Sequence, residues 1–492
     1  RAVRLAALYR PPRVPGPPRA PKQTRQDRLD AQMEKAAPLV DALLAKCLEL
    51  GRPPDKAEFE LYEAVREAFG SLDKALRLMI LHKPNVAEML AAARQLRADS
   101  LRVYLAGQLF EKRRAYKSLE PVLQRDIRGF FSDYRSAMES GRELIYSLGV
   151  IENVGRACHE AAEKGLGWLE EGQSLQLHTS MVERLPPILR TYVAVGTVLY
   201  GDVTGAALVK IHIRSGKLTL MQFDDFTGSA LPKMTQRVKL DLRNQDMQIF
   251  DYVAPYDPPY LYRKSRFVDE EIANYAEQVA FEEALDKLAL LNFDGFGPSA
   301  EAFDALLSER RYVVDGMQLM RSREIPAADQ SCGKNFTYRQ LIECGDTWSC
   351  LRPDNLPREP GSYSAMLDLT VFILDPLIEY FGMVSLTYGF CSSGLARKIS
   401  GRIAPRLDQH AAHEKKRDGS VVCERLGAAV DIVVDDEDME EVARWVISNL
   451  PFDRLYFYGP SKPIHVSYGP QHSRAAYRMV EGKSGALLPR AF

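Results

Sequence analysis

The sequence predicts a multidomain α+β protein that has a helical N-terminal region, an α+β middle domain with antiparallel hairpins, and a C-terminal α+β domain. The length of 492 residues exceeds what one hydrophobic core usually supports. The composition, with 46% hydrophobic and 27% charged residues, is typical of a globular protein. Apolar residues follow a helical period in the first part of the chain, and this period changes to strand-like alternation near residue 205.

The first part of the chain divides into an arm and a helical region. Residues 1–30 contain six prolines and eight basic residues against two acidic ones, which predicts a basic, Pro-rich linker. Residues 31–150 are expected to be helical. Apolar side chains there recur at the spacing of an amphipathic helix, at Val40, Leu43, Leu44, Cys47 and Leu48. A following helix is expected to end at Gly70, and Ser71 is a suitable N-cap for the next one.

The α+β middle domain is expected over residues 151–310. Apolar and polar residues alternate over 209–214 and again over 218–222, on either side of the turn signal Ser215-Gly216. This pattern predicts a β-hairpin with one buried face. The elements expected after it are one strand within 238–252 and helices at 269–290 and 300–308.

Residues 331–492 are expected to form a separate C-terminal domain. Its spine is predicted as a long helix over 363–381, in which apolar residues recur at helical spacing. The elements expected after this helix are strands at 383–388 and 428–434, a helix at 439–450, and strands near 454–458 and 463–468.

Composition excludes several classes of protein. No run of 18 apolar residues is present, so no membrane span is expected. The seven cysteines include no CxxC pair, which argues against a disulfide scaffold or a zinc ribbon and favours a reducing, cytoplasmic setting. The first 30 residues are unlike a signal peptide because they are not apolar. Since the chain begins with Arg1, we expect a fragment or a processed product that a further domain precedes.

The distribution of charge suggests a nucleic-acid partner. Residues 1–150 carry 27 Lys and Arg against 19 Asp and Glu, whereas the remainder carries 38 against 47. Within 111–135, basic residues alternate with aromatic ones, as in a DNA-binding surface or in a helix whose aromatic side chains face inward. Both interpretations stay open. In either case the cations of this stretch are expected to be largely exposed, and they include Arg113, Arg114, Lys117, Arg125 and Arg128.

The histidines suggest a metal site in the C-terminal domain. Four of the eight lie in the last 83 residues. His410 in a loop, Asp431 entering a strand and His465 within a later strand can converge on one ion, and catalytic zinc uses three such ligands. His413 and Cys423 are spare candidates. The alternative is that these are ordinary loop and strand residues.

Three stretches of the C-terminal domain form a recognisable series: Asp408-Gln-His410, Gly427-Ala-Ala-Val-Asp431-Ile and Ile464-His465-Val-Ser467. Through these and other stretches, residues 335–470 resemble the zinc peptidases of the D-alanyl-D-alanine carboxypeptidase family. The resemblance implies a zinc-peptidase-like fold over about 331–492, and zinc ligands at His410, Asp431 and His465.

The chain departs from that family at three places. Sixteen residues separate His410 from Gly427, where the family has two; if they are not an insertion, Glu424 occupies the ligand position. Cys391 aligns with a family arginine, and Tyr458 aligns with the glutamate that serves as general base. Loss of a general base costs about 10²–10⁴-fold in rate, so the differences predict a degenerate peptidase.

A second resemblance is carried by the stretches 126–131, 185–192, 200–202, 209–212 and 262–267. Through them, residues 40–300 resemble the region that follows the methyltransferase domain in DNA phosphorothioation-associated methyltransferases. The glycine-rich SAM-binding turn is not found in this chain, so SAM is expected as a cofactor only if a methyltransferase domain lies upstream of Arg1.

Three functions follow as hypotheses. The first is an accessory or targeting part of a bacterial DNA-modification or defence protein, which carries a degenerate peptidase-like domain that binds zinc. Its expected partners are DNA and other DNA-modification or defence proteins. The second is an active zinc-dependent peptidase or amidase, with a base from elsewhere, such as Glu414 or Glu424. The third is a metal-free structural interaction protein.

Overall fold

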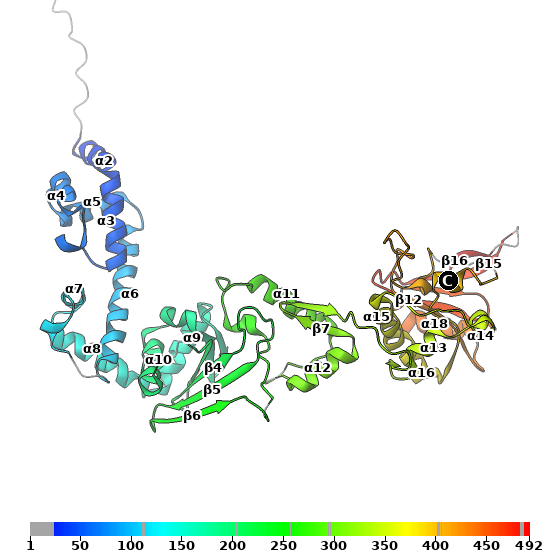
Figure 1. Ribbon diagram of the computed structural model, residues 1–492. Coiled ribbons are helices and arrows are strands. Elements are labelled where there is room, and N and C mark those ends of the chain that lie inside the picture. Colours follow the sequence, from blue (N-terminus) through cyan, green and yellow to red (C-terminus); the bar gives the residue numbers. More distant parts are fainter. Residues whose placement is uncertain are drawn as a thin grey trace, which may run out of the picture. The chain divides into compact units, whose positions relative to one another are not determined.

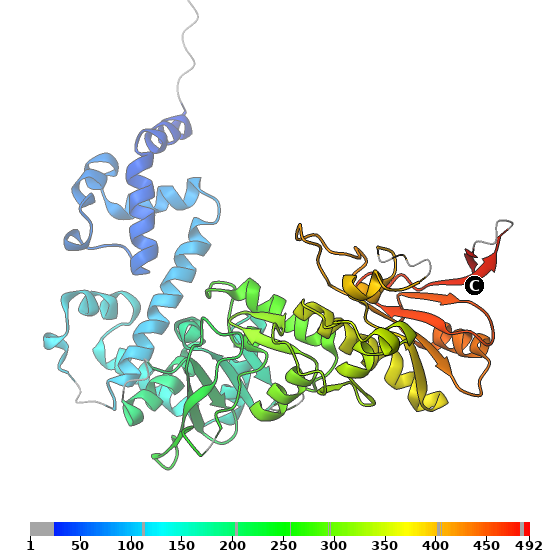
Figure 2. The same ribbon diagram turned by 45° about the vertical axis from the view of Figure 1, so that its right-hand side comes forward.

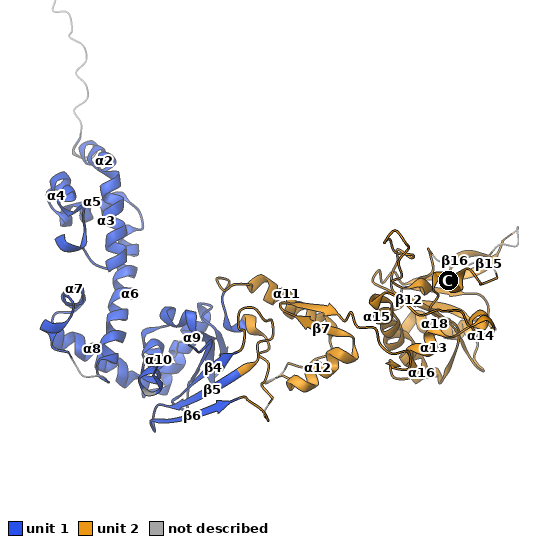
Figure 3. Ribbon diagram, in the orientation of Figure 1, with its two compact units in different colours: residues 1–223, 235–251, 266–269 blue, residues 224–234, 252–265, 270–492 orange. Residues whose placement is uncertain are grey.

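The computed structural model describes residues 24–110, 114–201, 205–255, 257–293, 295, 297–400, 404, 406–482 and 487–492 (Figure 1 and Figure 2). The described chain divides into two compact units (Figure 3). Unit 1 holds residues up to 223, 235–251 and 266–269, and unit 2 holds 224–234, 252–265 and 270–492. Each unit combines helices with mainly antiparallel sheets, so the predicted multidomain α+β fold is confirmed. Residues of the predicted middle domain contribute to both units.

Unit 1 begins with helices that follow the predicted periodicity. They are α2 (Arg25–Lys35), α3 (Ala37–Leu50), α4 (Tyr62–Phe69), α5 (Leu72–His82), α6 (Val86–Gly107), α7 (Pro121–Phe130), α8 (Tyr134–Leu148) and α9 (Ile151–Glu163). Helix α2 begins within the predicted arm, most of which lies outside the described residues. Helix α4 ends at Gly70, and the Ser71 side chain accepts a hydrogen bond from the N–H of Lys74, as predicted for an N-cap.

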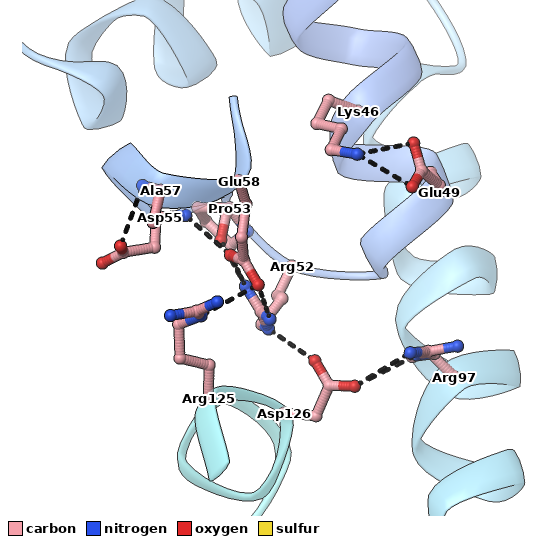
Figure 4. A network of polar contacts seen from close by, with 10 residues as sticks. All are labelled: Lys46, Glu49, Arg52, Pro53, Asp55, Ala57, Glu58, Arg97, Arg125 and Asp126. Atoms are coloured by element: carbon pink, nitrogen blue, oxygen red, sulfur yellow. Dashed lines mark hydrogen bonds and ion pairs between the residues drawn. The ribbon is translucent and has the colours of Figure 1, made fainter. Parts of the chain in front are cut away.

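A buried network of ion pairs joins the helices of unit 1 (Figure 4). The guanidinium of Arg52 binds both carboxylate oxygens of Glu58, each at 2.8 Å, and its Nε donates to Oδ1 of Asp126 at 2.8 Å. Arg97 on α6 binds the other oxygen of Asp126 at 3.0 Å, and Arg125 on α7 pairs with Glu58 at 2.9 Å. The side chains of Arg52, Glu58 and Asp126 are at most 5% exposed. The network therefore ties the segment after α3 to α6 and α7.

This network predicts a loss of stability in acid. Hydrogen bonding to Arg52 lowers the pKa of Glu58 to about 2, against the opposing effect of burial. Because the folded-state pKa lies below the ordinary value of 4.5, the stabilisation is complete above about pH 4.5 and is lost as pH falls towards 2. Denaturant unfolding at several pH values should show this loss, and Glu58→Gln should remove much of it. An equal acid loss in the variant would contradict the assignment.

The basic residues within 111–135 that were predicted to be exposed differ in their actual exposure. Arg114, Lys117 and Arg128 are exposed, as predicted, and Arg128 lies over the ring of Tyr116, 5.8 Å from its centroid. The prediction is wrong for Arg125, whose side chain is 26% exposed, because it reaches inward to the Glu58 carboxylate. Arg113 lies outside the described residues.

The remainder of unit 1 is a six-stranded antiparallel sheet with helices on one face. Its strands lie in sequence order: β1 (Trp168–Glu170), β2 (Ser174–His178), β3 (Leu208–His212), β4 (Lys217–Phe223), β5 (Met234–Asp241) and β6 (Asp246–Asp251). The predicted hairpin is β3–β4, and its apolar face packs with α9 and α10 (Pro187–Tyr200). The single strand expected within 238–252 is instead the hairpin β5–β6. Asp241 forms the turn by accepting hydrogen bonds from the N–H groups of Arg243 and Asn244.

Unit 2 begins with two helices and a hairpin and continues into a second sheet. The first elements are α11 (Tyr275–Leu288), α12 (Ala300–Glu309), β7 (Tyr312–Asp315), β8 (Gln318–Arg321), β9 (Ser331–Cys332), β10 (Phe336–Thr337), α13 (Tyr338–Ile342) and α14 (Asp346–Leu351). The predicted long helix is α15 (Pro360–Leu369), a π-helical stretch over Thr370–Leu374, and α16 (Asp375–Phe381).

The second sheet has the strand order β11-β12-β14-β13-β15-β16 and is antiparallel except between β13 and β15. Its elements are β11 (Val384–Tyr388), α17 (Ser393–Ala396), β12 (Ala428–Val434), α18 (Met439–Asn449), β13 (Arg454–Phe457), β14 (Ile464–Tyr468), β15 (Ala475–Glu481) and β16 (Leu487–Ala491). Apolar side chains of β12, β13 and β14 form the core with α15, α16 and α18. Strands β15 and β16 were not expected from the sequence.

Two further predictions can be compared with the structure. None of the seven cysteines, all of which are described, forms a disulfide. Among the described helices, none is both long enough and apolar enough to cross a membrane.

Candidate metal centre

The three predicted ligands meet at one place in unit 2. Asp431 on β12 lies directly opposite His465 on the neighbouring strand β14, so their side chains project from the same face of the sheet. His410 belongs to a short 3-10 turn (Gln409–Ala411) that packs beside β12. Two neighbouring strands and one loop therefore supply the cluster.

The candidate ligand atoms are close to one another. Nδ1 of His465 lies 2.9 Å from Oδ1 of Asp431 and 3.1 Å from Nε2 of His410. The same Asp431 oxygen lies 3.3 Å from Nε2 of His410. Ligand atoms at about 2.0–2.2 Å from a tetrahedral zinc ion are about 3.3–3.6 Å apart. The cluster therefore needs to open by only a few tenths of an ångström to surround such an ion.

The environment of His410 fixes which nitrogen faces the cluster. Its Nδ1 lies 2.7 Å from the carbonyl oxygen of Gly389 and donates to it, which leaves Nε2 as the nitrogen that faces Asp431 and His465. A ring N–H that donates to a carbonyl is the usual support for a metal-binding histidine. The imidazole is 3% exposed, so this orientation is held by packing.

A second set of hydrogen bonds holds the turn that carries His410. The Gln409 side chain is fully buried; its amide donates to Asp453 and to the carbonyl of Leu426, both at 2.8 Å. The hydroxyl of Ser467, on β14, donates to the Gln409 carbonyl oxygen at 2.7 Å. Gln409 thus connects the turn to the strand that carries His465.

The charges of the cluster are coupled. Burial opposes ionisation of Asp431, but the charges and hydrogen bonds of His410 and His465 outweigh it and hold the pKa of that carboxyl well below its usual range. Burial disfavours the imidazolium form of His410, whereas Asp431 and Asp408 favour it, and the net effect raises the pKa of His410. Both shifts therefore favour an added positive charge among these atoms, whether a proton or a metal ion.

The residues between His410 and Gly427 form a loop beside the cluster. A bridge between Lys415 and Val421 closes its end. The Glu414 carboxylate holds its base, because Oε1 accepts hydrogen bonds from the N–H groups of Arg358 and Glu359 and from the Ser362 hydroxyl. The loop therefore extends away from the cluster, and His410 keeps its place in the cluster.

The alternative ligands and bases lie elsewhere. Glu424 is exposed and, like Glu414, is not part of the cluster or of the pocket that surrounds it. The Nε2 of His413 accepts a hydrogen bond from the N–H of Gly427 at 3.3 Å, and Cys423 is buried outside the cluster. These four residues do not complete the site.

The cluster opens into a pocket of about 670 Å³. Asp346 and Asp408 line it together with Asp431, and burial raises the pKa of Asp408. Aromatic side chains line it as well, namely Trp348, Tyr388, Tyr456 and Tyr458. Met479 on β15 and Leu487 and Pro489 on β16 supply an apolar wall. Asp408 and this wall were missed from the sequence; the acidic residue two positions before His410 was the available signal.

Of the two residues that differ from the resembled family, Tyr458 and Cys391, only Tyr458 lies at the pocket. Tyr458 lines the pocket, and burial raises its pKa to about 12, so the phenol is neutral and can donate a hydrogen bond. Cys391 does not line this pocket; its thiol lies 3.5 Å from the Ser392 carbonyl, and burial raises its pKa to about 11.

The candidate site is therefore a buried His–Asp–His cluster at the base of an acidic and aromatic pocket. The two sequence resemblances stay predictions. In comparisons with known proteins, no family model, no curated protein and no solved structure matches this chain.

Proposed function

We propose that the C-terminal domain is a zinc-binding domain that recognises a polar ligand in the pocket above the metal. The proposal rests on one observation: Nε2 of His410, Oδ1 of Asp431 and Nδ1 of His465 lie within 3.3 Å of one another. Two nitrogens and one oxygen are a donor set that zinc accepts. The three residues come from three segments, and the His410 ring is held in place by its hydrogen bond to the Gly389 carbonyl, so the site is preorganised.

The residues of the pocket define what such a ligand meets. When bound, zinc would supply Lewis acidity towards an oxygen of the ligand. The neutral Tyr458 hydroxyl can donate a hydrogen bond to the same ligand, and the apolar wall of β15 and β16 excludes water from one side.

We expect this domain to be a poor hydrolase. A tyrosine stands where the resembled family has its base, and loss of a base costs about 10²–10⁴-fold. The zinc-loaded chain should show no measurable release of amine from a D-alanyl-D-alanine dipeptide or from a peptide-amide library. Calorimetric titration with the same compounds tests for binding without turnover. Robust hydrolysis that is lost in His465→Ala would contradict this expectation.

One observation favours a metal-dependent hydrolase as a second candidate function. Asp408 lines the pocket beside the cluster and offers a carboxylate that Tyr458 does not. If hydrolysis is found, Asp408→Asn separates the candidates, because removal of a working base lowers kcat by about 10²–10⁴-fold while zinc stays bound. Unchanged turnover in this variant would exclude Asp408 as the base.

The wider role proposed for the chain is that of an accessory or targeting part of a DNA-modification or defence protein. The support is the resemblance of residues 40–300 and the exposed cations Arg114, Lys117 and Arg128. Nucleic-acid binding that responds to salt is the property that this role requires.

A further inference from the structure

The sheet of unit 1 has a second face, opposite the one that packs with α9 and α10. Val209, Ile211, Leu218, Leu220 and the alternate residues of β5 point into the core with α9 and α10. The intervening residues lie on the opposite face because side chains alternate along a strand. They include Lys210 and His212 on β3, Lys217 and Thr219 on β4, and Arg237 and Lys239 on β5.

This face carries cations that repel one another. Burial and the neighbouring charges of Arg237, Lys217 and Lys210 lower the pKa of Lys239. Burial and the same lysines lower the pKa of His212 to about 4, so the imidazole is neutral at pH 7. A group of cations held this close has a favourable site for an added anion.

The acidic groups on the face compensate only part of this charge. Glu170 lies 3.4 Å from Nζ of Lys210, and Asp241 lies 3.9 Å from Nζ of Lys217. Asp246 on β6, in register with Asp241, is the third carboxylate, against the four cations Lys210, Lys217, Arg237 and Lys239. The Asp241 carboxylate also accepts the backbone N–H groups of the β5–β6 turn. Among the described residues, no carboxylate lies within ion-pair distance of Lys239.

Aromatic rings lie at both edges of the same face. Phe250, on edge strand β6, pairs with Arg237 in the sheet and is 37% exposed. The guanidinium carbon of Arg237 and Nζ of Lys239 lie 5.0 Å and 5.2 Å from the centroid of its ring. Trp168, on edge strand β1, is in register with Gln176 and hence with Lys210, and its ring packs against Phe267 and the guanidinium of Arg266. Cations therefore lie between two aromatic edges.

We propose that this face binds single-stranded nucleic acid, with phosphates on Lys210, Lys217 and Lys239 and a base stacked on Phe250. Base stacking on exposed rings, together with cations that follow the backbone, is how sheets and grooves hold single strands. Six strands at about 4.8 Å spacing span about 24 Å, which is enough for a site of several nucleotides. A duplex fits poorly, because its major groove admits a helix or a two-stranded ribbon rather than the face of a broad sheet.

The test uses the full chain and a fluorescent dT12 oligonucleotide, with rU12 as a second probe, in anisotropy titrations. Lys210→Gln with Lys239→Gln should weaken binding at least about tenfold at low salt. It should also make the slope of log K against log salt shallower by about 1.4, since each single-strand contact contributes about 0.7. Phe250→Leu should weaken binding about 5- to 150-fold, with little change in the slope.

The matched control is Lys35→Gln with Lys74→Gln, which removes the same charge from exposed positions of helices α2 and α5 in the helical region. It should bind the oligonucleotides within about twofold of the parent. Lys210→Arg with Lys239→Arg should retain binding, which separates loss of charge from misfolding. The proposal is wrong if the parent binds neither probe, if the sheet-face pair binds like the parent, or if the control loses as much affinity. In the last case the nucleic acid lies on the helical region instead.

Discussion

His465→Ala is expected to weaken zinc binding by more than about 100-fold. Nδ1 of His465 lies within hydrogen-bond distance of both Asp431 and His410, so its removal leaves two ligands and an open position. Loss of a supporting residue alone typically costs 10–100-fold in metal affinity, and loss of a ligand should cost more. Competition with a chromophoric chelator measures the effect.

His472→Ala is the matched control for this experiment. His472 is exposed, follows the same strand and does not line the pocket. It should bind zinc with the affinity of the parent. Equal zinc affinities of the parent and His465→Ala would show that any bound zinc lies elsewhere. If only His472→Ala lost zinc affinity, the metal would lie at His472 on the surface, and the proposed centre would be wrong.

Asp126→Ala is expected to destabilise unit 1 by about 3–5 kcal/mol. The substitution removes one of the two carboxylates that neutralise Arg52, whose side chain is 5% exposed. Breaking a buried ion pair costs this much. Glu58 alone then faces the positive charges of Arg52, Arg97 and Arg125, and Nε of Arg52 stays buried without its acceptor. Denaturant unfolding gives the free energy, and hydrogen exchange of peptides within 37–130 assigns it to the helices that the network joins.

Arg97→Gln is the control for this second effect. Arg97 binds the same carboxylate, but its side chain is 43% exposed, so the pair should contribute less than about 1 kcal/mol. A cost of several kcal/mol for Arg97→Gln, or of less than about 1 kcal/mol for Asp126→Ala, would contradict the importance assigned to the buried Arg52 pair.

Local patterns were sufficient to predict many of the elements. Amphipathic spacing predicted α3, and turn residues predicted the β3–β4 hairpin. The N-cap residue Ser71 predicted the start of α5. The β5–β6 turn was missed because its signal is side-chain capping by Asp241 rather than a glycine. Strands β15 and β16 were missed, and β16, with the sequence LLPRA, does not alternate between apolar and polar residues.

The candidate site was predictable in its ligands but not in its surroundings. His410, Asp431 and His465 were named from residue type and resemblance, and the structure brings these three together. The wall of the pocket depends on strands that follow the ligands by 10 residues or more, which no local motif encodes. The pairing of Arg52 with Asp126 joins residues 74 positions apart, and such a contact cannot be inferred from charge periodicity.

The most direct test of the account is anomalous diffraction at the zinc edge from crystals of the chain grown with zinc. One peak is predicted, at about 2.0–2.2 Å from Nε2 of His410, Oδ1 of Asp431 and Nδ1 of His465. A zinc-containing crystal whose only peaks lie away from these three atoms, or a saturated crystal without any peak, would contradict the proposed metal centre.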